Sequence, residues 1–197
     1  MFTGIIETLG EITSIVQEKT NLHFEIKTNI TSELKIDQSV AHDGVCLTVV
    51  KLSEQTHTVT AIDETLRLTS LRDWKVGKLV NIERCMSANG RFDGHIVQGH
   101  VDTTATCTSI KDEQGSWLIE FEFMNNQFQK YVVRKGSICV NGTSLTVVTA
   151  GEKSFSIAVI PYTFEHTNFG KLQAGDIVNI EFDIIGKYVE KMMNVTL

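Results

Sequence analysis

The sequence lacks the features of a membrane, secreted or nucleic-acid-binding protein. No stretch of its 197 residues approaches the roughly 18 apolar residues of a membrane-spanning helix, and the first residues lack the basic start and apolar core of a signal peptide. The four cysteines form no CxxC pair, which is typical of reduced cytosolic thiols. A net charge of −6 is not the basic footprint of a nucleic-acid-binding protein. We therefore expect a soluble, cytoplasmic protein with no membrane or nucleic-acid partner.

Proline is also scarce, and this scarcity accompanies a composition that favours strands. There is one proline against 14 glycines, and Val, Ile and Thr are spread throughout the chain. Short alternating segments, separated by polar or glycine-bearing turns, occur at 22–27, 58–62, 118–123 and 154–159. This spacing predicts a small antiparallel barrel or sandwich. Closure into a barrel would remove the exposed strand edges.

What the chain does contain is a long internal repeat. The segment GVCLTVV at 44–50 returns as GTSLTVV at 142–148, and the register holds through 77–83 and 175–181. Upstream, Gly4 aligns with Gly99 at a slightly shorter offset. A repeat unit of about a hundred residues is the size of a domain. The repeat predicts two like domains at 1–87 and 94–183.

Helices are expected in three places. Short helices are predicted at 64–71 and, in the second copy, at 164–169. The unrepeated tail, 184–197, places apolar residues at helical spacing, which predicts an amphipathic helix. Its apolar face would pack on another subunit or fold back on its own domain; we favour the subunit.

Two matched hairpins carry the first candidate site residues. In 43–48 and 141–146, Cys46 and Thr48, or Ser144 and Thr146, share one face of a strand by two-residue alternation. An Asp-Gly or Asn-Gly turn is an ordinary hairpin device, so folding alone explains the turns. Folding alone explains less well why the small polar residues Cys46 and Ser144 occupy matching positions on the same face, and this suggests a ligand pocket.

Histidines provide the second signal. His95 and His100 flank Gly99, but no third metal ligand lies nearby at a usual spacing. Strand residues five apart also point to opposite faces, so we interpret the pair as proton carriers rather than metal ligands. Ile5 stands where His100 would be in the first half, so the halves are not chemically equivalent. The other four histidines are expected at the surface or in packing.

Several motifs together resemble the riboflavin synthase family along nearly the whole chain. They are MFTGIIE at 1–7, the G-[VT]-[CS]-LTV element in both halves, GH at 94–95, GHVD at 99–102, KGSI at 135–138, DETLRLT at 63–69 and IPYT at 160–163. The resemblance implies a mainly β fold of two tandem six-stranded antiparallel barrels, with short helices and a C-terminal trimerisation helix at 184–197.

The resemblance also implies the activity. Members of this family are transferases that dismutate two molecules of 6,7-dimethyl-8-ribityllumazine to riboflavin and 5-amino-6-ribitylaminouracil by moving a four-carbon unit. It implies two lumazines per active site, a homotrimer with the site between subunits, and no metal or cofactor. Association with a lumazine synthase shell is left open. The alternative is a non-catalytic fluorescent antenna protein that binds lumazine or flavin.

By the same resemblance, site residues fall into two sets. The N-terminal pocket is expected to use Gly4, Ile5, Ile6, Cys46, Leu47, Thr48, Thr60, Ala61, Ile62, Asp63, Glu64 and Thr65. The C-terminal pocket is expected to use Gly99, His100, Val101, Lys135, Ser144, Leu145, Thr146, Ala158, Val159, Ile160, Pro161, Tyr162 and Thr163. The candidate catalytic residues are Cys46, Ser144, His100 and Thr146. Ser144 and His100 would assist removal of a 7-methyl proton, and Cys46 would assist addition at C7.

Overall fold

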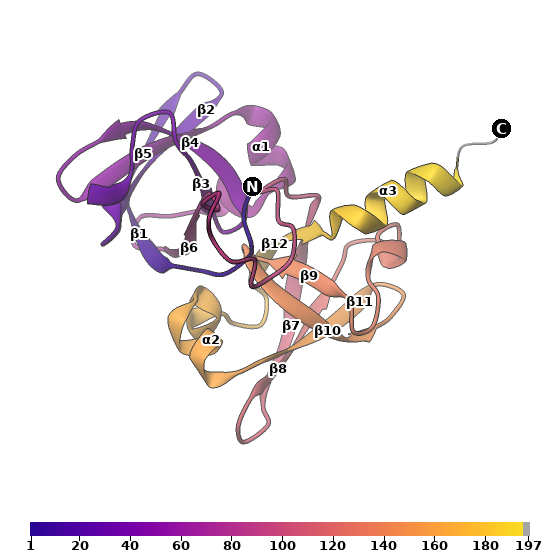
Figure 1. Ribbon diagram of the computed structural model, residues 1–197. Coiled ribbons are helices and arrows are strands. Elements are labelled where there is room, and N and C mark those ends of the chain that lie inside the picture. Colours follow the sequence, from indigo (N-terminus) through magenta and orange to yellow (C-terminus); the bar gives the residue numbers. More distant parts are fainter. Residues whose placement is uncertain (195–197) are drawn as a thin grey trace.

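The computed structural model describes residues 1–194 and shows two β-barrels followed by a projecting helix (Figure 1). The strands of the first half are β1 (Thr8–Glu18), β2 (Asn21–Lys27), β3 (Ser39–His42), β4 (Val45–Leu52), β5 (Thr56–Ala61) and β6 (Leu79–Arg84). Those of the second half are β7 (Thr103–Asp112), β8 (Trp117–Glu122), β9 (Ser137–Val140), β10 (Thr143–Ala150), β11 (Ser154–Val159) and β12 (Ile177–Phe182). The helices are α1 (Asp63–Leu68), α2 (Pro161–His166) and α3 (Ile184–Met193), with 3-10 turns at Thr31–Glu33, Ser70–Asp73, Gln129–Tyr131 and Asn168–Lys171.

The two halves close into barrels of the same topology. The strand order is β1-β2-β5-β4-β3-β6 in the first and β7-β8-β11-β10-β9-β12 in the second, with antiparallel neighbours throughout. The four segments expected as strands coincide with β2, β5, β8 and β11. The expected fold of tandem six-stranded antiparallel barrels is therefore confirmed, and a sandwich is not formed.

Each barrel has its own apolar core, as two-residue alternation requires. Phe24, Val49 and Val59 lie in the first core, and Phe121 and Phe155 lie in the second. The same alternation acts in the repeated hairpin. Leu47 points into the first core, whereas Cys46 on the preceding position is only half-buried.

The repeated hairpin turns join the barrels. Asp43 and Asn141 have φ angles of 46° and 45°, and the glycines after them have φ angles of 78° and 80°. A Cβ atom on Gly44 would lie 2.7 Å from the backbone nitrogen of Gly142, so only glycine permits this approach. Asn81 Nδ2 donates to the carbonyl of Asn141 at 2.8 Å, and Asn179 Nδ2 donates to that of Asp43 at 3.0 Å.

The short helices differ slightly from the expected ranges. Instead of one helix over 64–71, α1 ends at Leu68 and a 3-10 turn follows, because the Thr69 side chain accepts a hydrogen bond from the Leu71 nitrogen and starts a new turn. In the second half α2 begins at Pro161, three residues before the expected start. Proline suits the first turn of a helix because its missing N–H has no partner there.

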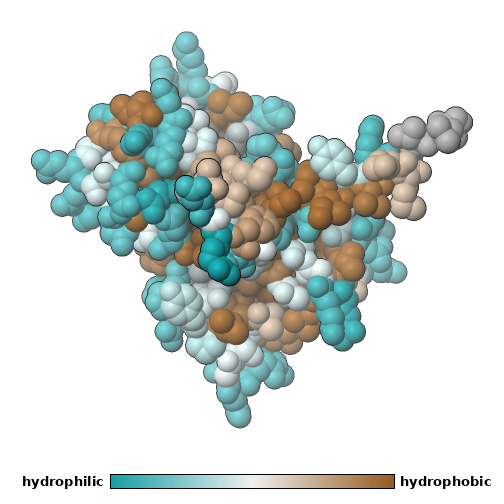
Figure 2. All heavy atoms as spheres, in the orientation of Figure 1, coloured by the Kyte–Doolittle hydropathy of each residue, from teal (hydrophilic) through white to brown (hydrophobic). Residues whose placement is uncertain are grey.

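The C-terminal helix α3 projects away from the barrels (Figure 1). Its polar side is tied to the second domain, since Lys187 Nζ lies 2.6 Å from Asp102 Oδ2 and Glu190 accepts hydrogen bonds from Lys130 and Tyr131. Its apolar side is exposed and continues a hydrophobic strip in Figure 2; the exposed residues are Ile185, Tyr188, Val189, Met192 and Met193. The expected helix end, 195–197, lies outside the described residues.

Candidate active site

The two chain segments around Gly4 and Gly99 exchange between the barrels. The segment at 1–7 (the N-terminal arm) precedes the first barrel, yet its Gly4 carbonyl accepts a hydrogen bond from the Ser144 nitrogen of the second, at 2.8 Å. The segment at 94–102 (the middle arm) precedes the second barrel, yet its Gly99 carbonyl accepts one from the Cys46 nitrogen of the first, at 2.9 Å. The arms pair with each other where Phe2 and Val97 exchange two backbone hydrogen bonds.

This exchange differs from the expected division of the site residues. We expected Gly4, Ile5 and Ile6 beside Cys46, and Gly99, His100 and Val101 beside Ser144. The structure instead places Gly4 beside Ser144 and Gly99 beside Cys46, through one backbone hydrogen bond at each position. The N-terminal arm, which lies within the expected domain 1–87, thus also contacts Ser144 of the second barrel.

A cavity of about 200 Å³ lies beside Cys46, which faces away from the core of the first barrel. We call this region the first opening, and the matching region around Ser144 the second opening. Its lining combines the start of β4, residues of α1 with the following Thr69, and the middle arm. The lining residues are Val45, Cys46, Glu64, Thr65, Leu68, Thr69, Gly99, His100 and Val101. Six of these were expected as site residues, and the exchanged arm contributes three of the six.

The thiol of Cys46 is held in its neutral form. Burial raises its pKa, and a hydrogen bond with the Ser39 side chain opposes that rise. Because the thiolate is the reactive nucleophile of cysteine, a raised pKa makes direct attack by Cys46 weak at neutral pH. The thiol is better suited to contact a substrate or to orient a water molecule.

Ser144, at the matching position of the second barrel, has a different partner. Its Oγ lies 2.6 Å from Nδ1 of His95, and His95 is buried. Burial lowers the pKa of His95, against the opposing attraction of Asp183, so the imidazole is neutral at physiological pH. A neutral imidazole bonded to a hydroxyl can take up or pass on a proton. Ser144 and His95 thus form a pair with general-base geometry.

The structure pairs Ser144 with His95, whereas we expected His100. The two histidines lie in different places, although residues 94–102 do not form the strand from which we expected this, because the middle arm crosses between the barrels over this interval. His95, at the start of the middle arm, contacts the N-terminal arm, since its backbone nitrogen donates to the Thr3 carbonyl at 3.1 Å. His100 reaches the cavity beside Cys46.

The other expected residues divide by exposure. Leu47, Ala61 and Val159 point into the cores and can offer only backbone atoms to a ligand. Lys135 lies exposed in the turn before β9. The remaining expected residues are half-buried or exposed; they are Ile5, Ile6, Thr48, Thr60, Ile62, Asp63, Leu145, Thr146, Ala158, Ile160, Pro161, Tyr162 and Thr163.

The expected site residues did not include Val45, Leu68 and Thr69 of the first cavity, nor two buried carboxylates, Glu83 and Glu181, that accept hydrogen bonds from the arms. The repeat could have pointed to the carboxylates, since both end the matched segments 77–83 and 175–181. Their burial could not be read from the sequence.

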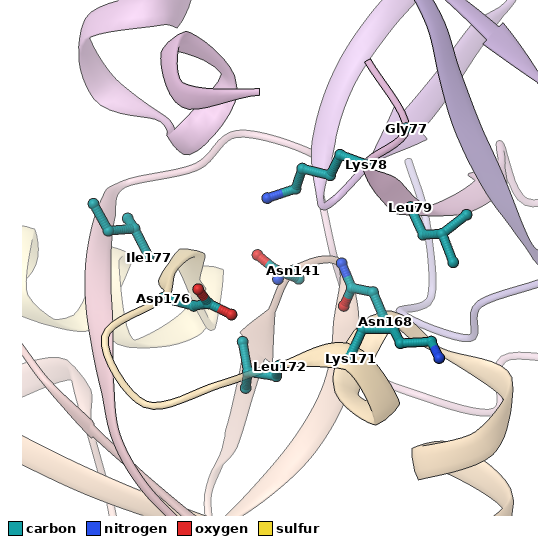
Figure 3. Close-up of a pocket in the computed structure, with 9 residues that line it drawn as sticks. All are labelled: Gly77, Lys78, Leu79, Asn141, Asn168, Lys171, Leu172, Asp176 and Ile177. Carbon is teal, nitrogen blue, oxygen red and sulfur yellow. The ribbon is translucent and has the colours of Figure 1, made fainter. Parts of the chain in front are cut away.

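A further cavity, of about 360 Å³, lies between the barrels and was not expected (Figure 3). Lys78 from the first domain and Asp176 from the second extend into it, at matching positions of the repeat. Within residues 1–194, no three His, Cys, Asp or Glu side chains gather as a metal site. No helix in that part of the chain has the length and apolar character needed to cross a membrane.

Comparison with known proteins agrees with this architecture. The Lumazine binding domain family matches residues 3–85 and again 98–183, one match per barrel. LumP complexed with 6,7-dimethyl-8-(1'-D-ribityl) lumazine has a similar fold, with a TM-score of 0.83, 23% identity, and coverage of 92% of this chain and 98% of that one. LumP complexed with riboflavin gives a TM-score of 0.85 at the same identity, with coverage of 92% and 99%.

Sequence relatives are more similar. Riboflavin synthase of Actinobacillus pleuropneumoniae is 40% identical over 194 residues, covering 98% of this chain and 90% of the relative. Riboflavin synthase of Bacillus amyloliquefaciens is 41% identical over 199 residues, covering 100% and 91%. Riboflavin synthase of Saccharomyces cerevisiae is 34% identical over 209 residues, covering 100% and 88%. With two barrels, two exchanged arms and full-length similarity of this degree, the chain belongs to the riboflavin synthase family of tandem lumazine-binding domains.

Proposed function

We propose that this protein is a riboflavin synthase, a transferase that dismutates two molecules of 6,7-dimethyl-8-ribityllumazine. One lumazine gives a four-carbon unit to the other, yielding riboflavin and 5-amino-6-ribitylaminouracil. The observation that carries the proposal is the pair of matching hairpin positions, Cys46 and Ser144, which have unlike polar neighbours. Cys46 and His100 lie at one opening, and Ser144 and His95 lie at the other. Two like sites suit two copies of one substrate, and unlike groups suit different roles for the copies.

In this proposal the chemistry of each opening follows from its groups. At the second opening, Ser144 and His95 accept a proton from the 7-methyl group of one lumazine, since a neutral imidazole behind a hydroxyl can serve as a general base. At the first opening, Cys46 contacts the second lumazine near C7 or orients water there, because its neutral thiol is a weak nucleophile. Thr146, Thr65 and Glu64 are suited to the ribityl hydroxyls. The lumazine ring accepts the electrons itself, so the proposal needs no cofactor.

We also propose that the working enzyme is a homotrimer in the cytoplasm, with its active site between subunits. The exposed apolar side of α3 supports a subunit contact, because its opposite side is already bound to the second domain. The four cysteines are free thiols, as a reducing compartment requires. Sedimentation of the full chain measures the trimer, and added lumazine synthase tests for association with that shell. Tyr188→Glu with Met192→Glu should give monomers.

The activity is tested by mixing purified protein with 6,7-dimethyl-8-ribityllumazine and following riboflavin absorbance. We expect riboflavin and the uracil product in equal amounts, with two lumazines consumed per riboflavin. Tight lumazine binding by fluorescence without any rise in riboflavin would contradict the proposal and support an antenna protein. Titration with a non-reacting lumazine analogue should saturate at two molecules per chain.

A further inference from the structure

Two buried carboxylates bind the exchanged arms in the same way. Glu83 on β6 is 4% exposed and accepts hydrogen bonds from the Thr3 nitrogen at 2.7 Å, the Thr3 hydroxyl at 2.8 Å and the Gly4 nitrogen at 3.0 Å. Each of its oxygens is therefore bound to the N-terminal arm. Hydrogen bonds to an ionised acceptor are roughly twice as strong as those between neutral groups.

Glu181 on β12 is the matching residue of the second barrel. It is 2% exposed and accepts from the Gln98 nitrogen at 2.6 Å and from the Gly99 and His100 nitrogens, both at 2.9 Å. Three consecutive backbone donors of the middle arm thus converge on one carboxylate. The conformation at Gly99, with φ of 81°, turns these donors toward it.

Each carboxylate belongs to one barrel and holds the arm that reaches the other. Glu83 of the first barrel fixes Gly4, whose carbonyl bonds to Ser144 of the second. Glu181 of the second barrel fixes Gly99, whose carbonyl bonds to Cys46 of the first. The fit is close, because a Cβ on Gly99 would lie 2.5 Å from that of Cys46, and a Cβ on Gly4 would lie 2.6 Å from that of Ser144. A small shift of an arm therefore changes the surroundings of the Cys46 or Ser144 side chain that it contacts.

We propose that Glu83 and Glu181 are positioning residues that act crosswise: Glu181 sets the environment of Cys46, and Glu83 sets that of the Ser144–His95 pair. The crosswise arrangement rests on the proposed function only in taking these two openings as the substrate sites. It makes each site depend on both barrels, so neither barrel alone has a complete opening. If each carboxylate only satisfied buried backbone donors, its substitution would lower the stability of the protein without changing one opening more than the other.

The test compares Glu83→Gln and Glu181→Gln with two local probes that require neither substrate nor turnover. One probe is the rate of Cys46 alkylation by iodoacetamide, read by peptide mass spectrometry so that Cys85 is counted separately. The other is the NMR titration of the His95 imidazole, whose arm contact is with Thr3. Glu122→Gln is the control, because Glu122 is an exposed glutamate on β8.

In Glu181→Gln we expect alkylation of Cys46 to be about tenfold faster, the size of effect that loss of a charged hydrogen bond produces, with His95 titrating as in the unchanged protein. In Glu83→Gln we expect the pKa of His95 to rise toward its ordinary value, with the alkylation rate of Cys46 unchanged. Glu122→Gln should alter neither probe.

Three outcomes would overturn the proposal: no change at either probe, equal change at both probes in both variants, or change at the opening of the barrel that carries the substituted residue. If a glutamine variant does not fold, the aspartate variant replaces it, because it keeps the charge but withdraws it by one methylene group. The same crosswise pattern is then required. Because riboflavin formation is measured separately, failure of the crosswise pattern is distinguishable from failure of the proposed activity.

Discussion

The Nε2 atoms of His42 and His57 lie 2.8 Å apart inside the first barrel, and both side chains are fully buried. The hydrogen-bond network assigns their tautomers. Nδ1 of His42 donates to the Val40 carbonyl at 3.1 Å, so its Nε2 accepts a hydrogen bond from the Nε2–H of His57. Both rings are therefore neutral. In the second barrel, Val140 and Phe155 stand at the matching positions, so this polar pair is specific to the first barrel.

This histidine pair predicts acid sensitivity of the first barrel. Burial lowers the pKa of His57 to about 4 and lowers that of His42 well below its ordinary value. Below about pH 6.5 these histidines bind protons in the unfolded chain but not in the folded barrel. Their contribution to the free energy of unfolding is therefore greatest above that pH and is lost as the pH falls toward 4. The shift at His57 alone corresponds to a loss on the order of 3 kcal/mol.

Urea unfolding between pH 4 and 8 checks this prediction. The double variant His42→Val, His57→Phe copies the second barrel, and we expect its stability to vary less with pH over this range. His23→Gln, at a half-buried histidine on β2, is the control and should keep the slope of the unchanged protein. An equal slope in the double variant would contradict the prediction.

Asp43 predicts a dependence of opposite sign. Its Oδ1 accepts from the Asn81 nitrogen and from Asn168 Nδ2, whereas Oδ2 has no hydrogen-bond partner within residues 1–194. Burial raises its pKa from 3.8 to about 7, against the attraction of Lys78. Because the folded pKa is raised, this carboxyl group favours the folded state at low pH and loses that effect as pH rises toward 7.

The substitution Asp43→Asn makes the position match Asn141 of the second hairpin. We expect it to stabilise the protein increasingly from pH 4 to 7 and by a constant amount above that, with about 4 kcal/mol as the upper limit from the size of the shift. Thermal unfolding at pH 5 and pH 8 measures the difference. A variant that is less stable than the original at pH 8 would show that the ionised carboxylate is required at the barrel junction.

The Ser144–His95 pair predicts a kinetic effect that is not additive. Ser144→Ala and His95→Gln should each lower kcat by roughly 10²–10⁴-fold, the usual contribution of general acid–base catalysis. The double variant should be little worse than either single one, because the two groups act through one hydrogen bond of 2.6 Å. Ser116→Ala, in the β7–β8 turn, is the control. Full turnover by the double variant would exclude these residues from proton transfer.

The close approach of Gly99 to Cys46 can be tested by substitution, with Gly77 as the control glycine. Both have positive φ, 81° and 88°, so alanine costs roughly 1–2 kcal/mol of backbone strain at each. A Cβ at 99 would also lie 2.5 Å from the Cβ of Cys46, whereas a Cβ at 77 has no atom within 4 Å.

We therefore expect Gly99→Ala to destabilise the protein more than Gly77→Ala and to weaken lumazine binding. Gly77→Ala should bind lumazine as tightly as the unchanged protein. Thermal melts and fluorescence titration give both quantities. Equal effects of the two substitutions on binding would show that the middle arm does not line the substrate site.

The sequence by itself determined the duplication, the strands and the family. These features are local or periodic: Val45, Leu47 and Val49 alternate with Cys46 and Thr48 along β4, and the hairpin recurs with Ser144 at the position of Cys46. Such patterns depend on residues that are close in the chain, so they can be read without knowing the fold.

The exchange of the arms was decided only by the tertiary structure. Gly4 reaches Ser144 and Gly99 reaches Cys46 through backbone hydrogen bonds, and the sequence does not specify which distant strand such a bond joins. The choice of His95 over His100 as the partner of Ser144 follows from that crossing. Contacts between distant segments depend on how the two closed barrels meet, and the close approach of Gly44 and Gly142 sets that geometry in three dimensions.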